Sequence, residues 1–377
     1  MRHRLVVSSV LALVFTVGPS AVSARERPPV AYVVTSVNSI SPVTASFAVA
    51  VREACQYAKG HRLIGCIDRV FATHDNGGTW TEITPRRWPR QLYVDDVQFL
   101  DGSIGWIADV SCVGPYSYLY RTRDGGATWR RSEIDSPGCQ AGAGVQVSFS
   151  DAAHGWLVNQ NPAGEYTAIS RTTDGGATWL GPFGGAADGY PANVVRLGPG
   201  RGLGTIAHAR LVGTGRYGAG HWVERPLPRT ARYRDRWISL PRMFGHRGVM
   251  TASLTHSSTG RDVALEFLTT DDGGQSWTVA ARIPDGRASD CPKGGAAIAP
   301  SPRVWWMTCR LADGHASVRG TTNAGASWNT AHRAPPAMEY LNPVDDRVAW
   351  AVAHHGEGLR LFVTEDGGTT WHRVRPA

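Results

Sequence analysis

The residues of this 377-residue sequence best suited to chemistry are arginines gathered between positions 216 and 242. Those arginines are Arg216, Arg225, Arg229, Arg232, Arg234, Arg236 and Arg242. Only Glu224 and Asp235 oppose them, so the local charge is +5, and Trp222, Tyr233 and Trp237 lie among them. Guanidinium groups bind carboxylates and phosphates through paired hydrogen bonds, and arginines with aromatic side chains are typical of protein interfaces. We therefore take the first six arginines and Trp237 as candidate ligand-binding residues. The alternative is a solvated face on a degenerate structural unit.

The carboxylates do not form an obvious catalytic pair. Asp101, Asp151 and Asp345 each stand five residues before a tryptophan. A glycosidase pair is needed once, on either side of one bond, whereas a residue that recurs in this way indicates a turn. The histidines and cysteines lack metal-ligand spacing, and no Gly-x-Ser-x-Gly or phosphate-binding glycine loop occurs. The sequence thus identifies no catalytic residue, and we expect no metal and no cofactor.

These candidates lie within an internal repeat. The motif Thr-x-Asp-x-Gly-x-Thr/Ser-Trp, called the box below, occurs five times, and a sixth copy has asparagine in place of aspartate. The paired positions are Asp75 and Trp80, Asp124 and Trp129, Asp174 and Trp179, Asp272 and Trp277, Asn323 and Trp328, and Asp366 and Trp371. Successive box tryptophans are 49, 50, 98, 51 and 43 residues apart, so one unit without a box is hidden in the spacing of 98. A fixed period near fifty is the mark of a repeat architecture of seven units.

Each unit offers four short strands separated by turn residues, which indicates an antiparallel β architecture closed into a ring. We therefore expect an all-β protein, a seven-bladed β-propeller of four-stranded antiparallel blades. The single propeller would span residues 25–377, with a degenerate fourth blade at about 185–240. Within a box, the aspartate can accept backbone hydrogen bonds and the glycines can take positive φ, so the motif is a hairpin turn covered by its tryptophan.

The motif resembles the Asp-box, or BNR, repeat. A second phrase, Val-x-Phe-x-Asp-x-x-x-Gly-Trp, spans Val97–Trp106 and Val147–Trp156 and resembles the repeat of the photosystem II assembly factor propellers and their bacterial relatives. The resemblance covers nearly all of the chain after residue 24. It implies a propeller whose boxes are structural and lie at the periphery, away from the binding face.

The boxes also resemble, more distantly, those of sialidases, so a secreted sialidase-like glycoside hydrolase is the alternative function. Such enzymes have an Arg-Ile-Pro motif before the first box. Here Arg282-Ile283-Pro284 follows the box that ends at Trp277, where it is expected to end a strand instead.

The N-terminus resembles an export signal. Arg2 and Arg4 precede an apolar stretch, Leu5 to Val17, and small residues follow at 21–24. We predict a signal peptide at residues 1–24 and a secreted or periplasmic, cell-envelope protein; an N-terminal membrane anchor is the alternative. The net charge of +8 falls to +6 without the signal.

The six cysteines favour disulfides in an exported chain. Pairing of nearest neighbours would join Cys55 to Cys66, Cys112 to Cys139, and Cys291 to Cys309, although fifteen pairings and free thiols stay open.

The function indicated is that of an exported, non-catalytic scaffold or binding protein. Its ligand would be a protein segment or an anion, with a glycan as a further candidate. An exported protein rarely meets nucleic acid, so we expect no nucleic-acid partner. We also expect a monomer without a transmembrane segment once the signal is removed.

Overall fold

A computed structural model describes residues 30–86, 92–111, 117–134, 144–160, 167–185, 193–198, 200–206, 209–215, 218–229, 235–255, 262–284, 294–310, 315–355 and 358–376. The predicted signal peptide lies outside these residues. Within them, no helix is long and apolar enough to cross a membrane.

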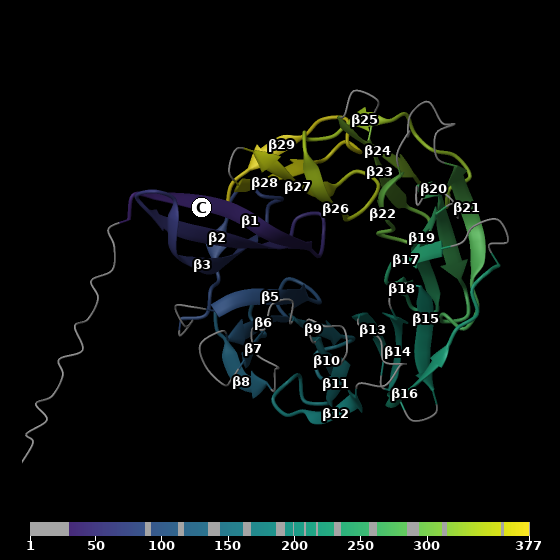
Figure 1. The fold of residues 1–377 in the computed structure, drawn as a ribbon, viewed down its shortest axis with the longest axis horizontal. Helices are drawn as coiled ribbons and strands as arrows, with labels where there is room; N and C mark the ends of the chain where they lie inside the picture. The colour runs from purple at the N-terminus through teal and green to yellow at the C-terminus, as the bar shows by residue number, and fades with distance from the viewer. Residues whose placement is uncertain are drawn as a thin grey trace, which may run out of the picture.

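Seven antiparallel sheets follow one another around a ring (Figure 1), which confirms the predicted propeller. Blade 1 contains β1 (Tyr32–Pro42), β2 (Ala48–Ala58), β3 (Arg62–Thr73) and β4 (Thr81–Glu82). Blade 2 contains β5 (Leu92–Phe99), β6 (Gly105–Ser111), β7 (Ser117–Thr122) and β8 (Arg130–Ile134). Blade 3 contains β9 (Gly144–Phe149), β10 (Gly155–Gln160), β11 (Thr167–Thr172) and β12 (Leu180–Gly185).

The hidden unit is a complete blade. Blade 4 contains β13 (Asn193–Gly198), β14 (Arg201–Ile206), β15 (Arg210–Gly215) and β16 (Gly218–Glu224). Blade 5 contains β17 (Asp235–Ile238), β18 (Arg242–Phe244), β19 (Arg247–Thr255), β20 (Asp262–Thr270) and β21 (Thr278–Pro284). It has five strands because β17 and β18 both pair with β19.

The last two blades close the ring. Blade 6 contains β22 (Gly294–Ile298), β23 (Trp305–Arg310), β24 (Ala316–Thr321) and β25 (His332–Arg333). Blade 7 contains β26 (Met338–Pro343), β27 (Ala349–His355), β28 (Gly358–Thr364) and β29 (His372–Val374). The first strand of each blade lies on the inner side of the ring, and β1 lies beside β28 where the two ends of the propeller meet (Figure 1).

The hydrophobic core lies between the blades. Seven clusters of buried side chains each join two neighbouring blades. Trp106, Trp156, Trp305, Trp306 and Trp350 are the largest fully buried side chains of these clusters. Both faces of a sheet are therefore apolar, and blade-to-blade packing supplies the burial that a single four-stranded sheet lacks.

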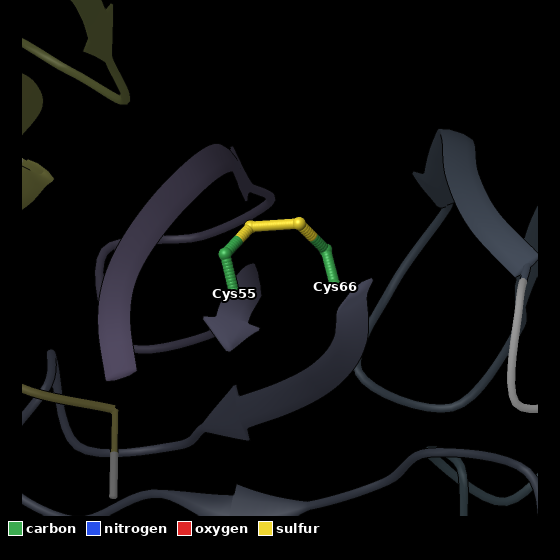
Figure 2. The surroundings of a disulfide bond; sticks show 2 residues. All are labelled: Cys55 and Cys66. Carbon is green, nitrogen blue, oxygen red and sulfur yellow. A yellow bond between two sulfur atoms is a disulfide. The ribbon is translucent and has the colours of Figure 1, made fainter. Parts of the chain in front are cut away.

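Blade 1 is longer than the others, and its strands extend beyond the ring (Figure 1). The predicted disulfide between Cys55 and Cys66 joins β2 to β3 in this blade (Figure 2). The other two predicted pairs depend on Cys112, Cys139 and Cys291, which lie outside the described residues. Cys309 is buried in β23.

Candidate functional site

The box aspartates are bonded within their own turns. Asp174 Oδ1 accepts hydrogen bonds from Thr178 N–H at 2.9 Å and from Thr172 Oγ1 at 2.7 Å, and its Oδ2 accepts one from Thr178 Oγ1 at 2.6 Å. Burial opposes its ionisation, but these hydrogen bonds lower the pKa of Asp174 to about 2. The same three bonds recur at Asp75, Asp124, Asp272 and Asp366. Asn323 Oδ1 accepts the equivalent two bonds, whereas its Nδ2 donates to Ser327 Oγ at 2.8 Å. The oxygens that could hold a ligand are thus engaged in the hairpin.

The box also ties each turn to its blade. Gly125 has a φ of 69° and donates its N–H to the Ser103 carbonyl of the facing turn at 2.9 Å. Gly126 has a φ of 93°, and a Cβ atom there would lie 2.7 Å from Ile83 of blade 1. Six box tryptophans pack against the interblade clusters, namely Trp80, Trp129, Trp179, Trp277, Trp328 and Trp371. These contacts support a structural role for the motif.

Side chains cross-link the inner strands of blades 2, 3 and 4. The N–H of Val147 donates to Asp96 Oδ2 at 2.8 Å, and the N–H of Phe149 donates to Gln98 Oε1 at 2.7 Å. One blade further on, the N–H of Arg196 donates to Ser148 Oγ at 2.8 Å. An inner strand has a partner strand on one side only, so its outward N–H groups need such acceptors. Blades 2 and 3 supply those acceptors to the next blade.

This series of cross-links does not extend through Val195. In β9, Ser148 stands just before the cross-linked Phe149 and accepts a hydrogen bond from the next blade. Val195 has the equivalent position in β13, just before Arg196, but its side chain cannot accept a hydrogen bond. In β17 of the next blade, Ser239 N–H donates to Thr251 O at 2.9 Å. Because antiparallel strands alternate in their bonding, the N–H of Ile238 points away from β19. No hydrogen bond connects it to another residue in the described ranges, so β17 has an open edge here.

A cavity of about 400 Å³ lies at this edge. Blade 4 contributes Asn193 and Thr205 to its lining, blade 5 contributes Trp237 and Ser253, and blade 6 contributes Ala297, among others. Trp237 is 60% exposed, whereas the side chain of Ile238 is fully buried. Ile238 therefore offers its backbone to the cavity, while Trp237 offers an aromatic face. Hydroxyl groups of Ser239, Thr251 and Ser253 add hydrogen-bonding capacity, and Leu265 adds an apolar wall.

Three of the predicted ligand-binding arginines can be placed. Arg225 donates from Nη2 to Thr214 O at 3.0 Å, and Arg229 is exposed. Arg236 donates from Nη2 to Pro228 O at 2.5 Å. None of the three lines the cavity at Trp237, so Trp237 is the one predicted residue placed there. Arg216, Arg232 and Arg234 lie outside the described residues.

Arg236 belongs to a charged cluster on blade 5, with Glu266 of β20 and Arg282 of β21. Fully buried Glu266 accepts hydrogen bonds from Nε of Arg282 at 2.8 Å and from its Nη2, and Arg236 Nη2 lies 3.9 Å from Glu266 Oε2. Burial lowers the pKa of Arg236; Glu266 opposes that effect, and Arg282 adds to it. Two guanidinium groups thus face one carboxylate. The Arg282-Ile283-Pro284 sequence accordingly ends β21, where Arg282 binds a buried glutamate.

Buried acids elsewhere have internal partners as well. Asp68 Oδ2 accepts the N–H of Val94 at 2.8 Å, and Asp109 Oδ1 accepts that of Tyr118 at 2.9 Å. Burial raises the pKa of Asp109 to about 7, against the lowering effect of Tyr118. A carboxyl with such a pKa suits acid catalysis, but Asp109 is fully buried and does not line a described cavity. Its geometry is that of a structural acceptor.

A larger cavity of about 1060 Å³ lies near the outer side of blades 1 and 2. One wall is the box turn of blade 2, whose polar groups bond one another. Glu82 in another wall is paired with Arg69 at 2.6 Å, and Arg131 stacks over Tyr118 at 4.4 Å. Much of its polar lining is thus already engaged. The cavity at Trp237 is smaller, but it has an open strand edge and an exposed aromatic side chain.

Among the described residues, the one cluster with metal-ligand geometry is Glu53 with Cys55 and Cys66. Its two sulfur atoms form a disulfide, so they are not thiolate ligands.

Sequence reasoning selected Trp237 but not the other lining residues. Asn193 and Thr205 belong to blade 4 and Ala297 to blade 6, and no local motif marks them. The one signal in the sequence was the break in the polar pattern at Val195.

No protein-family model matches the sequence, and no curated protein matches it. The fold does match solved structures. One is YCF48 bound to D1 peptide, with a TM-score of 0.51 and 13% identity over 92% of this chain and 97% of that chain. A second is YCF48 from Cyanidioschyzon merolae, with a TM-score of 0.49 and 21% identity over 76% of this chain and 86% of that one.

An enzyme is among the matched structures as well. The GH74 enzyme from Niastella koreensis gives a TM-score of 0.36 and 14% identity over 89% of this chain and 61% of that chain. At these identities the similarity concerns the propeller fold alone, and the chain is similar in fold to YCF48.

Proposed function

We propose that this protein is an exported, non-catalytic β-propeller that binds an extended segment of a partner protein along the inner edge of β17. The observation that carries the proposal is the exposed Trp237 beside an open strand edge in a cavity of about 400 Å³. An extended peptide can add to such an edge through main-chain hydrogen bonds, while pockets select its side chains.

The lining favours a peptide with an apolar side chain next to the residue that pairs with the edge of β17. Trp237 and Leu265 supply apolar surface, and the surrounding hydroxyls can bond the peptide backbone. The neighbouring Arg236, Arg282 and Glu266 carry one positive charge in excess, which favours acidic residues in the segment. An anion-binding role for the arginines between 216 and 236 stays a prediction. The structure of YCF48 bound to D1 peptide is consistent with this proposal, but that binding belongs to YCF48.

The proposal is tested by selecting binders from a displayed library of short peptides and measuring their affinity by fluorescence polarisation. Trp237→Ala should weaken binding about tenfold or more, since a buried aromatic anchor commonly contributes over 1 kcal/mol. Tyr340→Ala is the matched control, because Tyr340 is a 54% exposed aromatic residue of inner strand β26. N-methylation of the peptide amides that would hydrogen-bond to β17 should also abolish binding.

Selection of no peptide, or equal binding by wild type and Trp237→Ala, would refute the proposal. The glycoside hydrolase alternative needs two carboxylates that face a substrate. Asp96, Asp109 and Glu266 instead bond neighbouring groups. Release of a fluorophore from sialoside or β-glucoside substrates, lost on replacing one of the protein's carboxylates, would favour the hydrolase.

A further inference from the structure

A groove of about 410 Å³ lies at the seam where blade 1 meets blade 7. Four arginines line it, namely Arg52 of β2, Arg360 of β28, Arg373 of β29 and Arg375 just beyond β29. No carboxylate contributes to the described lining, which therefore carries four positive charges. More than three hundred residues separate Arg52 from the others, so ring closure brings them together.

Two of these guanidinium groups donate hydrogen bonds to backbone carbonyls. Arg52 donates from Nη1 to Pro376 O at 3.3 Å and lies 4.9 Å from the Phe71 ring centroid. Arg360 donates from Nη1 to Thr35 O at 2.6 Å and to Leu359 O at 3.0 Å. The backbone carbonyls orient Arg360 without neutralising it. The seam therefore fixes two charges that face the groove.

The other two arginines are open to a ligand. Arg373 and Arg375 are exposed, and neither makes a hydrogen bond or ion pair with another residue in the described part of the chain. Desolvation lowers the pKa of Arg373, and the charges of Arg375 and Arg360 lower it further. Glu82 of blade 1 is already paired with Arg69 at 2.6 Å. The protein thus gathers like charges that an anion would stabilise.

We propose that the groove between blades 1 and 7 binds a phosphate monoester of about the size of a sugar phosphate. The charges of Arg360, Arg373 and Arg375 exceed what one carboxylate can neutralise, whereas a phosphate monoester carries a charge of about −1.5 to −2 and three acceptor oxygens. Arginine pairs such oxygens through two parallel hydrogen bonds. The volume is at the lower end of the range for small-ligand sites, which fits one sugar ring and its phosphate. This site is separate from β17, so it can be tested independently of peptide binding.

Titration calorimetry with glucose 6-phosphate, glucose and glucuronate tests this proposal on the wild-type protein. We expect heat of binding with glucose 6-phosphate, much weaker binding of glucuronate and none of glucose. The double variant Arg373→Gln and Arg375→Gln should weaken glucose 6-phosphate binding about ten- to a hundredfold, because hydrogen bonds to charged groups are lost. Both side chains are exposed, so the variant should fold normally, as circular dichroism would verify.

The matched control is Arg303→Gln with Arg333→Gln, which removes two exposed arginines from blade 6 and leaves the seam intact. It should bind glucose 6-phosphate as the wild type does. An equal loss of glucose 6-phosphate binding in both double variants would show that only the net charge matters, and it would overturn the proposed site. Glucuronate binding as tight as that of glucose 6-phosphate would overturn the assignment to phosphate.

A second arm separates the sources of the phosphate. Vesicles of phosphatidylcholine with phosphatidic acid are compared with phosphatidylcholine alone in a sedimentation assay. Sedimentation that requires phosphatidic acid, Arg373 and Arg375 would assign the groove to a lipid headgroup, whereas binding of the soluble ester alone would assign it to a free ester. Binding of neither probe would overturn the proposal.

Discussion

Several acids of this protein are buried where ionisation is costly. Burial raises the pKa of Asp68 and of Asp96 to about 6, and that of Asp109 to about 7, from an ordinary value of 3.8. Each still accepts a backbone N–H, which lowers the pKa only in part. The folded state therefore binds protons that the unfolded chain releases between pH 4 and 7. By linkage, stability falls as pH rises through this range and is level above it.

Asp109→Asn should reduce the slope of the free energy of unfolding against pH by up to the amount that corresponds to one bound proton. The neutral amide retains the acceptor for Tyr118 and avoids the desolvation of a charge, so its advantage over wild type should grow from pH 4 to pH 8. The limit is about 4 kcal/mol, from about 1.4 kcal/mol for each of roughly three pKa units. Urea unfolding at a series of pH values measures this. Exposed Glu133→Gln is the control and should follow the wild type. An unchanged slope in Asp109→Asn would contradict the assignment.

At the scale of the elements, each inner strand is a sheet edge whose N–H groups need acceptors. Gln98 makes two such bonds between β5 and β9, since it accepts the N–H of Phe149 at 2.7 Å and donates to its carbonyl at 3.0 Å. β17 lacks an equivalent acceptor at Val195. The edge that cross-links close in blades 3 and 4 thus lacks one beside Trp237.

Gln98→Leu should lower the free energy of unfolding by about 1–3 kcal/mol, because a backbone N–H and C=O lose their partners between two blades. Guanidinium chloride unfolding gives the value, and hydrogen exchange should rise at Phe149. Gln275→Leu is the control at an exposed box position and should change stability by less than about 0.5 kcal/mol. If both variants unfold alike, the cross-link is not a stabilising contact.

At the scale of the whole molecule, the ring is closed by packing between its first and last blades. Trp350 of β27 is fully buried against Val37, Ala48 and Ala50 of blade 1, and its ring lies 6.0 Å from that of Trp80. Asn76 of the first box donates to Glu365 of the last at 2.5 Å. Closure at this seam is noncovalent in the described residues, so it depends on these contacts.

Trp350→Ala should cost about 3–5 kcal/mol, as do other truncations of large buried side chains. It should also increase hydrogen exchange in β1 and β28, because these strands meet at the seam. Trp305→Ala is the comparison, since Trp305 is as deeply buried but lies between blades 5 and 6. It should cost about as much and leave exchange in β1 unchanged. Equal exchange patterns in the two variants would show that the seam has no separate opening.

The sequence by itself determined the architecture. Six boxes at a regular period, with a doubled spacing of 98 residues, established seven blades, because a turn motif and its hydrophobic partners are local in the chain. The pairing of Cys55 with Cys66 was one of fifteen left open and was expected from their being neighbours in the sequence; the structure confirms it, with the two residues opposite each other on β2 and β3. Hydrogen bonds in the boxes could be anticipated in the same way, since their donors and acceptors lie within four residues.

Only the tertiary structure decided which side chains meet. The arginines near residue 225 are close in sequence, yet Arg225 and Arg236 bind different backbone carbonyls. Arg52 and Arg375 are far apart in sequence, yet they line one groove. The physical reason is that blades interact through their faces and inner edges, so contacts between blades depend on ring closure and on which strand edge has an acceptor. Neither property can be predicted from the sequence of a single repeat.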